Sequence, residues 1–189
     1  MKKKKMNFYA CSLPDGRSGI TQSWDECLSF INNAKGAKYK KFVNYDQAKF
    51  WLDNGADYKA KFFHDEDGVY FDSGTGGNGK VKVRVTDKNG EDLVKDIFVK
   101  DDATNNFGEL IACKYALKYA LETGIKKVFG DSRLVIKFWS KGRANILNLD
   151  TLVLIEEVKA LREEFERNGG EIKLISGDVN PADLGFHRK

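Results

Sequence analysis

Four carboxylates stand at positions where structural needs alone do not explain them. Asp72 ends an apolar run that is typical of a central strand, although aspartate is depleted in strands. Glu109 lies in line with small apolar residues four, seven and eleven positions further on, and a carboxylate facing a core needs a cation or hydrogen-bond partners. Asp131 follows a strand and precedes a helix, where α/β sheets bind ligands, and Asp183 ends the sequence Asn-Pro-Ala-Asp. Clustered carboxylates without His or Cys favour hard cations such as Mg²⁺ or Mn²⁺.

Each of these carboxylates also has an ordinary structural explanation. Asp72 is compatible with a turn before Gly74, and Asp183 with turn chemistry. Glu109 would interact favourably with a helix dipole from the first turn, and aspartate at position 131 is a common N-cap. Taken one residue at a time, both interpretations stay open.

The pattern after residue 67 predicts the elements that position these carboxylates. A helix over residues 105–123 ends at Gly124, and a second long helix covers residues 149–167, with a shorter one at 132–139 between them. Strands are expected at residues 68–72, 80–86, 93–99, 127–130 and 171–176, with Asn89-Gly90 as a hairpin signal. Three antiparallel strands followed by alternating helices and strands predict an α/β fold with a mixed sheet flanked by helices.

Composition excludes several other classes of protein. The three cysteines (Cys11, Cys27 and Cys113) are odd in number and far apart, which indicates neither a disulfide framework nor a zinc site, so a reducing cytoplasm is expected. With only two histidines, His64 and His187, a His-rich metal site is not expected. No apolar run exceeds four residues, so no membrane-spanning helix and no membrane partner are expected.

Charge is distributed unevenly along the chain. Residues 1–64 hold 12 Lys and Arg against 6 Asp and Glu, a net charge of +6, and residues 65–189 hold 20 against 22, a net charge of −2. A basic module joined to a nearly neutral one indicates a polyanion-binding element. The alternative is that the lysines are a solvated surface.

The basic half begins with a small β-β-α-β-α unit of fewer than fifty residues. Strands are expected at residues 7–11, near 20–21 and at 37–43. The capping box from Ser23 to Glu26 opens a helix with Leu28 and Ile31 on its inner face, and Asn44 caps a second helix. A unit of this size buries little core, so we interpret it as a binding appendage.

The sequence Lys38-Tyr39-Lys40-Lys41-Phe42 concentrates the chemistry of this unit. In a strand Lys38, Lys40 and Phe42 share one face, and Tyr39 and Lys41 share the other. Basic residues interleaved with aromatic residues form surfaces that contact phosphates and stack on bases or sugars. The alternative is a wet sheet face above buried aromatic residues.

The N-terminal pattern closely resembles the hybrid-binding domain of type 1 ribonucleases H, also called viroplasmin-like in plant pararetroviral inclusion proteins. The matching residues are Phe8-Tyr9-Ala10, Gly19, Trp24-x-x-Cys27, Gly36-Ala37-Lys38-Tyr39-Lys40-Lys41-Phe42 and Ala48-x-Phe50. The resemblance implies that Trp24 and Tyr39 pack against the DNA strand, that Lys40 and Lys41 hold phosphates, and that backbone groups read RNA 2′-hydroxyls. Tyr9 and Lys38 are assigned to the same nucleic-acid surface.

The second half resembles the ribonuclease H catalytic domain. Its motifs occur in that family's order: Phe71-Asp72-Ser73-Gly74, Thr104-Asn105-Asn106-Phe107-Gly108-Glu109-Leu110, Gly130-Asp131-Ser132 and Ala182-Asp183. The resemblance implies a mixed five-stranded sheet flanked by helices and two Mg²⁺ ions, with Mn²⁺ as a substitute. Asp72 would bridge both ions, Glu109 and Asp131 would divide between them, and Asp183 would hold the ion on the nucleophile side. The loop 74–79, from Gly74 on, and Asn105 with Asn106 would contact the RNA strand.

The chain departs from that family in the loop before the last aspartate. Many members carry a His, or sometimes a Glu, there, whereas Asp178 is the only ionisable candidate in this loop of the chain, so Asp178 is a candidate catalytic residue. His187 is a weaker substitute. The stretch between residues 139 and 149 holds only Lys141 and Arg143, so the basic protrusion of some members is absent.

The prediction is therefore an endoribonuclease that cleaves the RNA strand of RNA–DNA hybrids by a two-metal-ion mechanism, leaving 5′-phosphate and 3′-hydroxyl ends. Its expected parts are a basic tail (1–5), a small α+β hybrid-binding domain (6–53), a linker (54–66) and the catalytic domain (67–189). We expect a cytoplasmic monomer that binds hybrids and, through its N-terminal domain, double-stranded RNA. The alternatives are a non-catalytic hybrid-binding or dsRNA-binding protein and another nuclease of the same architecture, such as a resolvase or integrase.

Overall fold

A computed structural model describes residues 7–60, 62–76 and 79–185. It divides the chain into two compact units, Met1–Phe62 and Phe63–Lys189, which are described separately below. The predicted tail 1–5, His187, and residues 77 and 78 of the predicted loop 74–79 lie outside the described residues. Among the helices of the described segments, none is long and apolar enough to cross a membrane.

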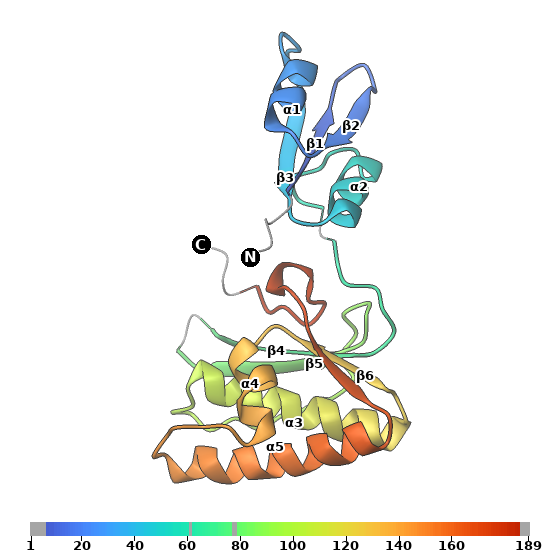
Figure 1. The fold of residues 1–189 in the computed structure, drawn as a ribbon. Coiled ribbons are helices and arrows are strands. Elements are labelled where there is room, and N and C mark those ends of the chain that lie inside the picture. Colours follow the sequence, from blue (N-terminus) through green and yellow to red (C-terminus); the bar gives the residue numbers. More distant parts are fainter. Residues whose placement is uncertain (1–6, 61, 77–78, 186–189) are drawn as a thin grey trace. The chain divides into compact units, whose positions relative to one another are not determined.

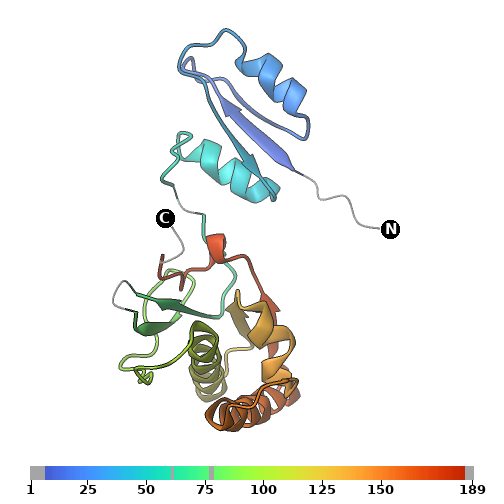
Figure 2. The same ribbon diagram turned by 90° about the vertical axis from the view of Figure 1, so that its left-hand side faces the viewer.

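The N-terminal unit has the predicted β-β-α-β-α order (Figures 1 and 2). Its elements are β1 (Phe8–Ser12), β2 (Ser18–Thr21), α1 (Trp24–Ile31), β3 (Lys38–Phe42) and α2 (Tyr45–Asp53). The three strands form an antiparallel sheet in the order β2-β1-β3, which leaves β3 at an edge. Both predicted caps are present, because Ser23 accepts a hydrogen bond from the Glu26 N–H and Asn44 accepts one from the Asp46 N–H.

The two helices pack against opposite faces of β1. Ala10 belongs to the core that α2 forms with Ala48 and Trp51, whereas its neighbour Cys11 contacts Cys27 of α1. Consecutive strand residues point to opposite faces, so this contact pattern places one helix on each side. The predicted inner face of α1 was partly wrong, since Cys27 is buried and Leu28 is 48% exposed.

Cys11 and Cys27 form a disulfide that joins β1 to α1, with their Cα atoms 6.3 Å apart. The expectation of no disulfide was therefore wrong. The two cysteines are 16 positions apart in the sequence, but a strand followed by a capped helix brings them into contact. The cysteine argument for a reducing compartment loses its basis, and a cytoplasmic location stays a prediction. Cys113 is buried and free.

The residues predicted as a linker divide between the two units. Ala56 is fully buried in the core of the N-terminal unit, and its N–H donates to the Trp51 carbonyl at 2.9 Å. His64 instead donates its N–H to the Val179 carbonyl of the second unit at 2.7 Å. The ordered residues of the first unit thus continue past the end of α2 at Asp53.

The second unit is a mixed sheet with helices packed on it, as Figure 1 shows. Its strands are β4 (Val69–Thr75), β5 (Val81–Thr86), β6 (Lys127–Gly130) and β7 (Glu171–Leu174), in the order β5-β4-β6-β7. Strands β4 and β5 are antiparallel, and the two other pairings are parallel. The helices are α3 (Asn105–Thr123), α4 (Arg133–Lys137) and α5 (Leu149–Arg167), with short 3-10 turns η1 (Trp139–Lys141) and η2 (Gly177–Val179).

The predicted strand over residues 93–99 does not form, so the sheet of the described residues has four strands instead of five. Only an isolated bridge between Thr86 and Asp92, and a hydrogen bond from the Leu93 N–H to the Val85 carbonyl, continue the hairpin. Asp96 has a φ of 56°, which interrupts an extended chain. The apolar residues Leu93, Val94, Ile97 and Val99 of this stretch therefore pack on the core without a strand ladder.

Helix α3 lies close against the sheet near its first turn. A Cβ added at Gly108 would lie 2.3 Å from the Ser73 Oγ and 2.4 Å from a Val81 methyl carbon. Only glycine permits this approach of helix and strand. The residues that follow on this helix, including Leu110, Cys113 and Leu117, are buried in the main core. The close approach brings the start of α3 to β4.

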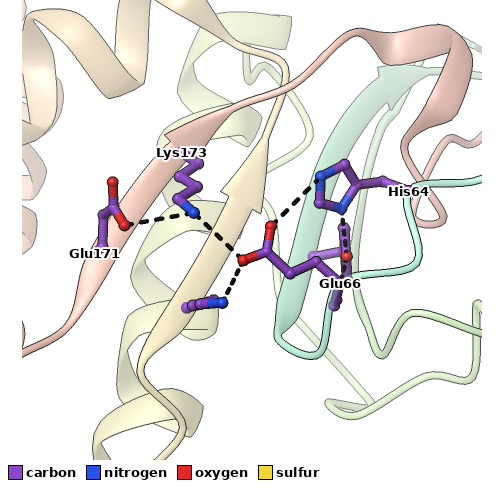
Figure 3. A network of polar contacts seen from close by, with 6 residues as sticks. His64, Glu66, Glu171 and Lys173 are labelled. Atoms are coloured by element: carbon purple, nitrogen blue, oxygen red, sulfur yellow. Dashed lines mark hydrogen bonds and ion pairs between the residues drawn. The ribbon is translucent and has the colours of Figure 1, made fainter. Parts of the chain in front are cut away.

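The segment before β4 is held to the sheet by a polar network around Glu66, which Figure 3 shows. Glu66 forms ion pairs with Lys127 of β6 and with Lys173 of β7, the latter at 3.3 Å. The bond from Lys127 is the main reason that the pKa of Glu66 is lowered. The His64 Nδ1 lies 2.7 Å from the Tyr70 hydroxyl, so the network links this segment to β4, β6 and β7.

Candidate active site

Asp72, Glu109 and Asp131 meet in one cluster. Each offers an oxygen atom, and the three oxygen atoms lie within 4.8 Å of one another. Asp72 and Glu109 are buried, and Asp131 is half-buried. The structure therefore brings together three of the four carboxylates that the sequence analysis selected.

The topology explains why these residues meet. Strands β4 and β6 are parallel neighbours, and Phe71 pairs with Gly130, so the next residues, Asp72 and Asp131, emerge side by side. Glu109 comes from the first turns of α3, directly after the glycine that seats this helix on Ser73. Strand order and one close helix contact thus assemble the cluster.

A loop after β7 brings Asp183 toward the same place. Asn180 is fully buried, its Nδ2 donates to the Phe71 carbonyl at 2.9 Å, and its Oδ1 accepts from the Ala182 N–H at 3.1 Å. The Leu184 N–H donates to the Asp72 Oδ2 at 3.0 Å. The Asp183 charge is close enough to contribute to the raised pKa of Asp72, although Asp183 lies outside the 4.8 Å group.

The hydrogen bonds that Asn180 forms in this loop were not predicted from the sequence. The residue was interpreted as part of a turn, whereas its side chain forms the main bridge between the loop and β4. The available signal was an amide side chain immediately before proline, in the motif that ends at Asp183.

Burial and the charges of neighbouring carboxylates raise the pKa values of Glu109 and Asp72. The pKa of Glu109 is raised to about 9, first by burial and then by the charges of Asp72 and Asp131. The pKa of Asp72 is raised to about 6, again mainly by burial and then by Asp131. Perturbed carboxyl groups in one cluster are typical of functional sites.

The cluster also fits a divalent cation. Within the described part of the chain, the buried Oε2 of Glu109 has no hydrogen-bond partner. A buried oxygen atom without a partner is unfavourable unless a cation or a proton satisfies it. Three carboxylates without nitrogen or sulfur donors match the preference of Mg²⁺ and Mn²⁺ for oxygen ligands.

Asp178, the candidate catalytic residue, is exposed in the short turn η2. A Cβ at the preceding Gly177 would lie 2.6 Å from the Asp131 Oδ2, so this turn packs directly against the carboxylate cluster. The turn places Asp178 beside the site without making it a member of the 4.8 Å group.

The predicted RNA-contacting residues lie at the margin of the same site. Gly74 is buried in β4, two positions after Asp72. Asn105 is half-buried at the start of α3, where its carbonyl accepts a hydrogen bond from the Ser73 Oγ at 3.4 Å, and Asn106 is exposed. Thr104 caps this helix by accepting from the Phe107 N–H at 3.2 Å. The helix start and β4 are thus joined beside the carboxylates.

The N-terminal unit presents an aromatic cluster on the α1 side of its sheet. Trp24 lies between Tyr9 and Tyr39, with ring centroids 5.5 and 5.4 Å away. Trp24 is 39% and Tyr39 48% exposed, so both rings are accessible to a ligand. Lys41 pairs with Tyr9 across the strands and shares this face.

Lys38 and Lys40 face the α2 side of the sheet instead. The Lys38 Nζ donates to the Gly55 carbonyl at 3.3 Å, and the Lys40 Nζ lies 5.4 Å from the Phe42 ring centroid. The alternation that was predicted for this strand is therefore present. Of the six residues assigned to the nucleic-acid surface here, Tyr9, Trp24, Tyr39 and Lys41 lie together.

The N-terminal unit is similar to domains of known proteins. Residues 8–52 match the family described as "Ribonuclease H1 N-terminal domain". A stretch of 47 residues of the chain is also 47% identical to a "Ribonuclease H" of Saccharomyces cerevisiae. That match covers 24% of this chain and only 13% of the yeast protein.

Solved structures with ribonuclease H names are also similar to the chain. The N-terminal RNase H domain of a Mycobacterium tuberculosis protein has 26% identity and a TM-score of 0.40, covering 53% of this chain and 88% of that one. RNase H1 of Halobacterium salinarum has 24% identity and a TM-score of 0.43, with coverages of 58% and 85%. An RNase H1 isolated from compost has 23% identity and a TM-score of 0.42, with coverages of 60% and 86%. Through residues 8–52, the chain resembles the N-terminal domain of ribonucleases H1.

The raised pKa of Glu109 predicts that the metal-free protein loses stability as the pH rises. A carboxyl group whose pKa is higher in the folded state stabilises that state most below its unfolded value, here 4.5, and loses this contribution as the pH rises toward about 9. We expect the melting temperature in a chelator to fall by about 5 °C or more between pH 6 and pH 9. Glu109→Gln should flatten this fall.

Glu122→Gln is the matched control, because Glu122 lies on the same helix and is exposed. It should leave the pH dependence unchanged. An equal fall in the Glu109→Gln protein would show that the proton on Glu109 does not stabilise the fold.

Proposed function

We propose that the chain is an endoribonuclease that hydrolyses the RNA strand of RNA–DNA hybrids. The observation that carries this proposal is the convergence of Asp72, Glu109 and Asp131. The buried Oε2 of Glu109 in this cluster has no hydrogen-bond partner among the described residues. The ribonuclease H1 N-terminal domain in the same chain supports a hybrid as the substrate. A cleavage assay with Mg²⁺ against hybrid, double-stranded RNA, double-stranded DNA and single-stranded RNA tests it directly.

Two divalent cations, Mg²⁺ with Mn²⁺ as a substitute, would be held by Asp72, Glu109, Asp131 and Asp183. Such ions activate a water molecule and stabilise the leaving 3′-oxygen, so the products would carry 5′-phosphate and 3′-hydroxyl ends. The chain itself orients its carboxylates for this task. The Leu184 N–H holds one oxygen of Asp72, and Asn180 anchors the loop that carries Asp183. Because its pKa is raised, Glu109 must lose its proton when a cation binds at neutral pH.

The N-terminal domain would hold the hybrid while the second unit cuts it. Trp24, with Tyr9 and Tyr39, would stack against the DNA strand, and Lys41 on the same face would contact a phosphate. Lys38 and Lys40 would reach neighbouring phosphates from the other face of the edge strand. Gly74, Asn105 and Asn106 would contact the RNA strand beside the carboxylates. The proposal includes action as a cytoplasmic monomer and binding of double-stranded RNA by the N-terminal domain.

We expect Asp72→Asn or Asp131→Asn to abolish cleavage and to leave hybrid binding intact. Loss of a residue that only orients a metal ligand typically costs about 10- to 100-fold, so loss of a ligand should reduce the single-turnover rate by more than ~100-fold. Binding is measured separately in Ca²⁺ or in the absence of a divalent cation. The exposed Asp67, changed to Asn, serves as the control. Robust turnover by the Asp72→Asn enzyme would contradict the assignment of the site.

We expect replacement of Lys40 and Lys41 by alanine to weaken the salt dependence of hybrid binding. Each lost phosphate contact lowers the slope of log affinity against log salt by about 0.9 for duplex DNA, so the double variant should lose up to ~1.8. The measurement is a titration of hybrid at several salt concentrations. Lys49→Ala is the control, since Lys49 lies on α2 and pairs with Asp53. An unchanged slope in the double variant would remove both lysines from the binding surface.

We expect Asp178→Asn to lower the steady-state kcat more than the single-turnover rate. The exposed turn that carries Asp178 packs on Asp131, which supports a role for Asp178 in steps in which products leave the carboxylate cluster. Rapid-quench and multiple-turnover assays on one hybrid separate the two rates. His187→Ala should change neither rate much. If Asp178→Asn keeps both rates at the parent value, Asp178 has no role in the reaction.

A further inference from the structure

Residues 54–60, which follow α2, fold back along the free edge of β3. The Tyr58 hydroxyl accepts a hydrogen bond from the Tyr39 N–H at 3.2 Å and donates one to the Tyr39 carbonyl at 3.1 Å. One side chain therefore satisfies both backbone groups that this edge residue turns outward. An edge strand otherwise presents such groups to solvent or to another chain.

The position of Tyr58 is itself well defined. Its ring packs against the buried Trp51 of α2, with the centroids 5.5 Å apart. Ala56 is buried below it with a φ of 53°, which turns the chain back toward the sheet. The Lys38 Nζ donates to the Gly55 carbonyl at 3.3 Å and adds a second link between this segment and β3.

Tyr39 is the residue of β3 for which such a contact matters most. Its outward N–H and carbonyl make its pairing with Cys11 a non-hydrogen-bonded one, so β1 holds Tyr39 only through the bonds of its neighbours. Its side chain lies on the opposite face from Trp51 and packs at 5.4 Å from Trp24. The position of the Tyr39 backbone thus determines where the Tyr39 ring lies in the aromatic cluster.

We infer that Tyr58 is a positioning residue for nucleic-acid binding, which fixes Tyr39, and through it Trp24, in the orientation that stacks on the sugars or bases of a hybrid. The binding module therefore extends to residue 60, beyond residues 8–52 that match the family. This inference rests on the proposed function, because it assumes that the aromatic cluster contacts the hybrid. The hydroxyl acts through Tyr39 and does not touch the ligand.

The test compares Tyr58→Phe with Tyr45→Phe in the full-length chain. The first change removes only the hydroxyl and keeps the ring on Trp51, and the second alters a similarly exposed tyrosine of the same unit. Two lost hydrogen bonds predict hybrid binding weaker by about 5- to 10-fold, with KM raised and kcat unchanged. Hydrogen exchange of the Tyr39 amide should be faster in Tyr58→Phe and unchanged in Tyr45→Phe.

The outcomes separate positioning from simple stabilisation. Unchanged hybrid affinity well below the melting transition would overturn the inference, even if Tyr58→Phe lowered the melting temperature. Unchanged exchange at Tyr39 would overturn it as well. If the parent protein binds no hybrid, the proposed function fails instead, and the exchange measurement alone then shows whether Tyr58 fixes Tyr39.

Discussion

Repulsion between closely placed carboxylates is the constraint on which the second unit depends. Asp72, Glu109 and Asp131 offer oxygen atoms within 4.8 Å of one another, in a place where two of the three residues are buried. Like charges at such a distance, away from water, strongly favour protonation or a bound cation. The surrounding structure must therefore hold the three groups together against a force that separates them. The elements that carry them are accordingly attached to one another at several points.

Several independent contacts hold the elements that carry the carboxylates in place. A parallel pairing fixes Asp72 beside Asp131, and the missing side chain at Gly108 allows α3 to bring Glu109 onto β4. The buried Asn180 attaches the last loop to the strand that carries Asp72. Glu66 also joins the segment before β4 to β6 and β7 through two lysines (Figure 3). A cation in the cluster would bind to a site that is already assembled.

The stability of the N-terminal unit is constrained differently, because its hydrophobic core is small. Only Ala10, Ala48, Trp51 and Ala56 are the buried members of its described hydrophobic cluster. Units with so little core usually need covalent or polar reinforcement. Here the Cys11–Cys27 disulfide fixes α1 on one face of β1, and Tyr58 supports the free edge of β3. The disulfide joins Cys11, which pairs with Tyr39, to the helix that begins at Trp24, and Tyr58 bonds to the backbone of Tyr39. Both reinforcements therefore lie next to the surface proposed to bind the hybrid.

The sequence by itself determined the element order, the caps at Ser23 and Asn44, and the choice of Asp72, Glu109 and Asp131, because local propensities and motif spacing are properties of short segments. Tertiary structure decided what depends on distant partners. The stretch 93–99 is rich in apolar residues like a strand but packs without a ladder, and Cys11 contacts Cys27 although their spacing gave no signal. The side chains of Asn180 and Tyr58 bond to backbone groups far away in the sequence, at Phe71 and Tyr39. A hydrogen bond to such a group leaves no local pattern, so only the folded chain shows it.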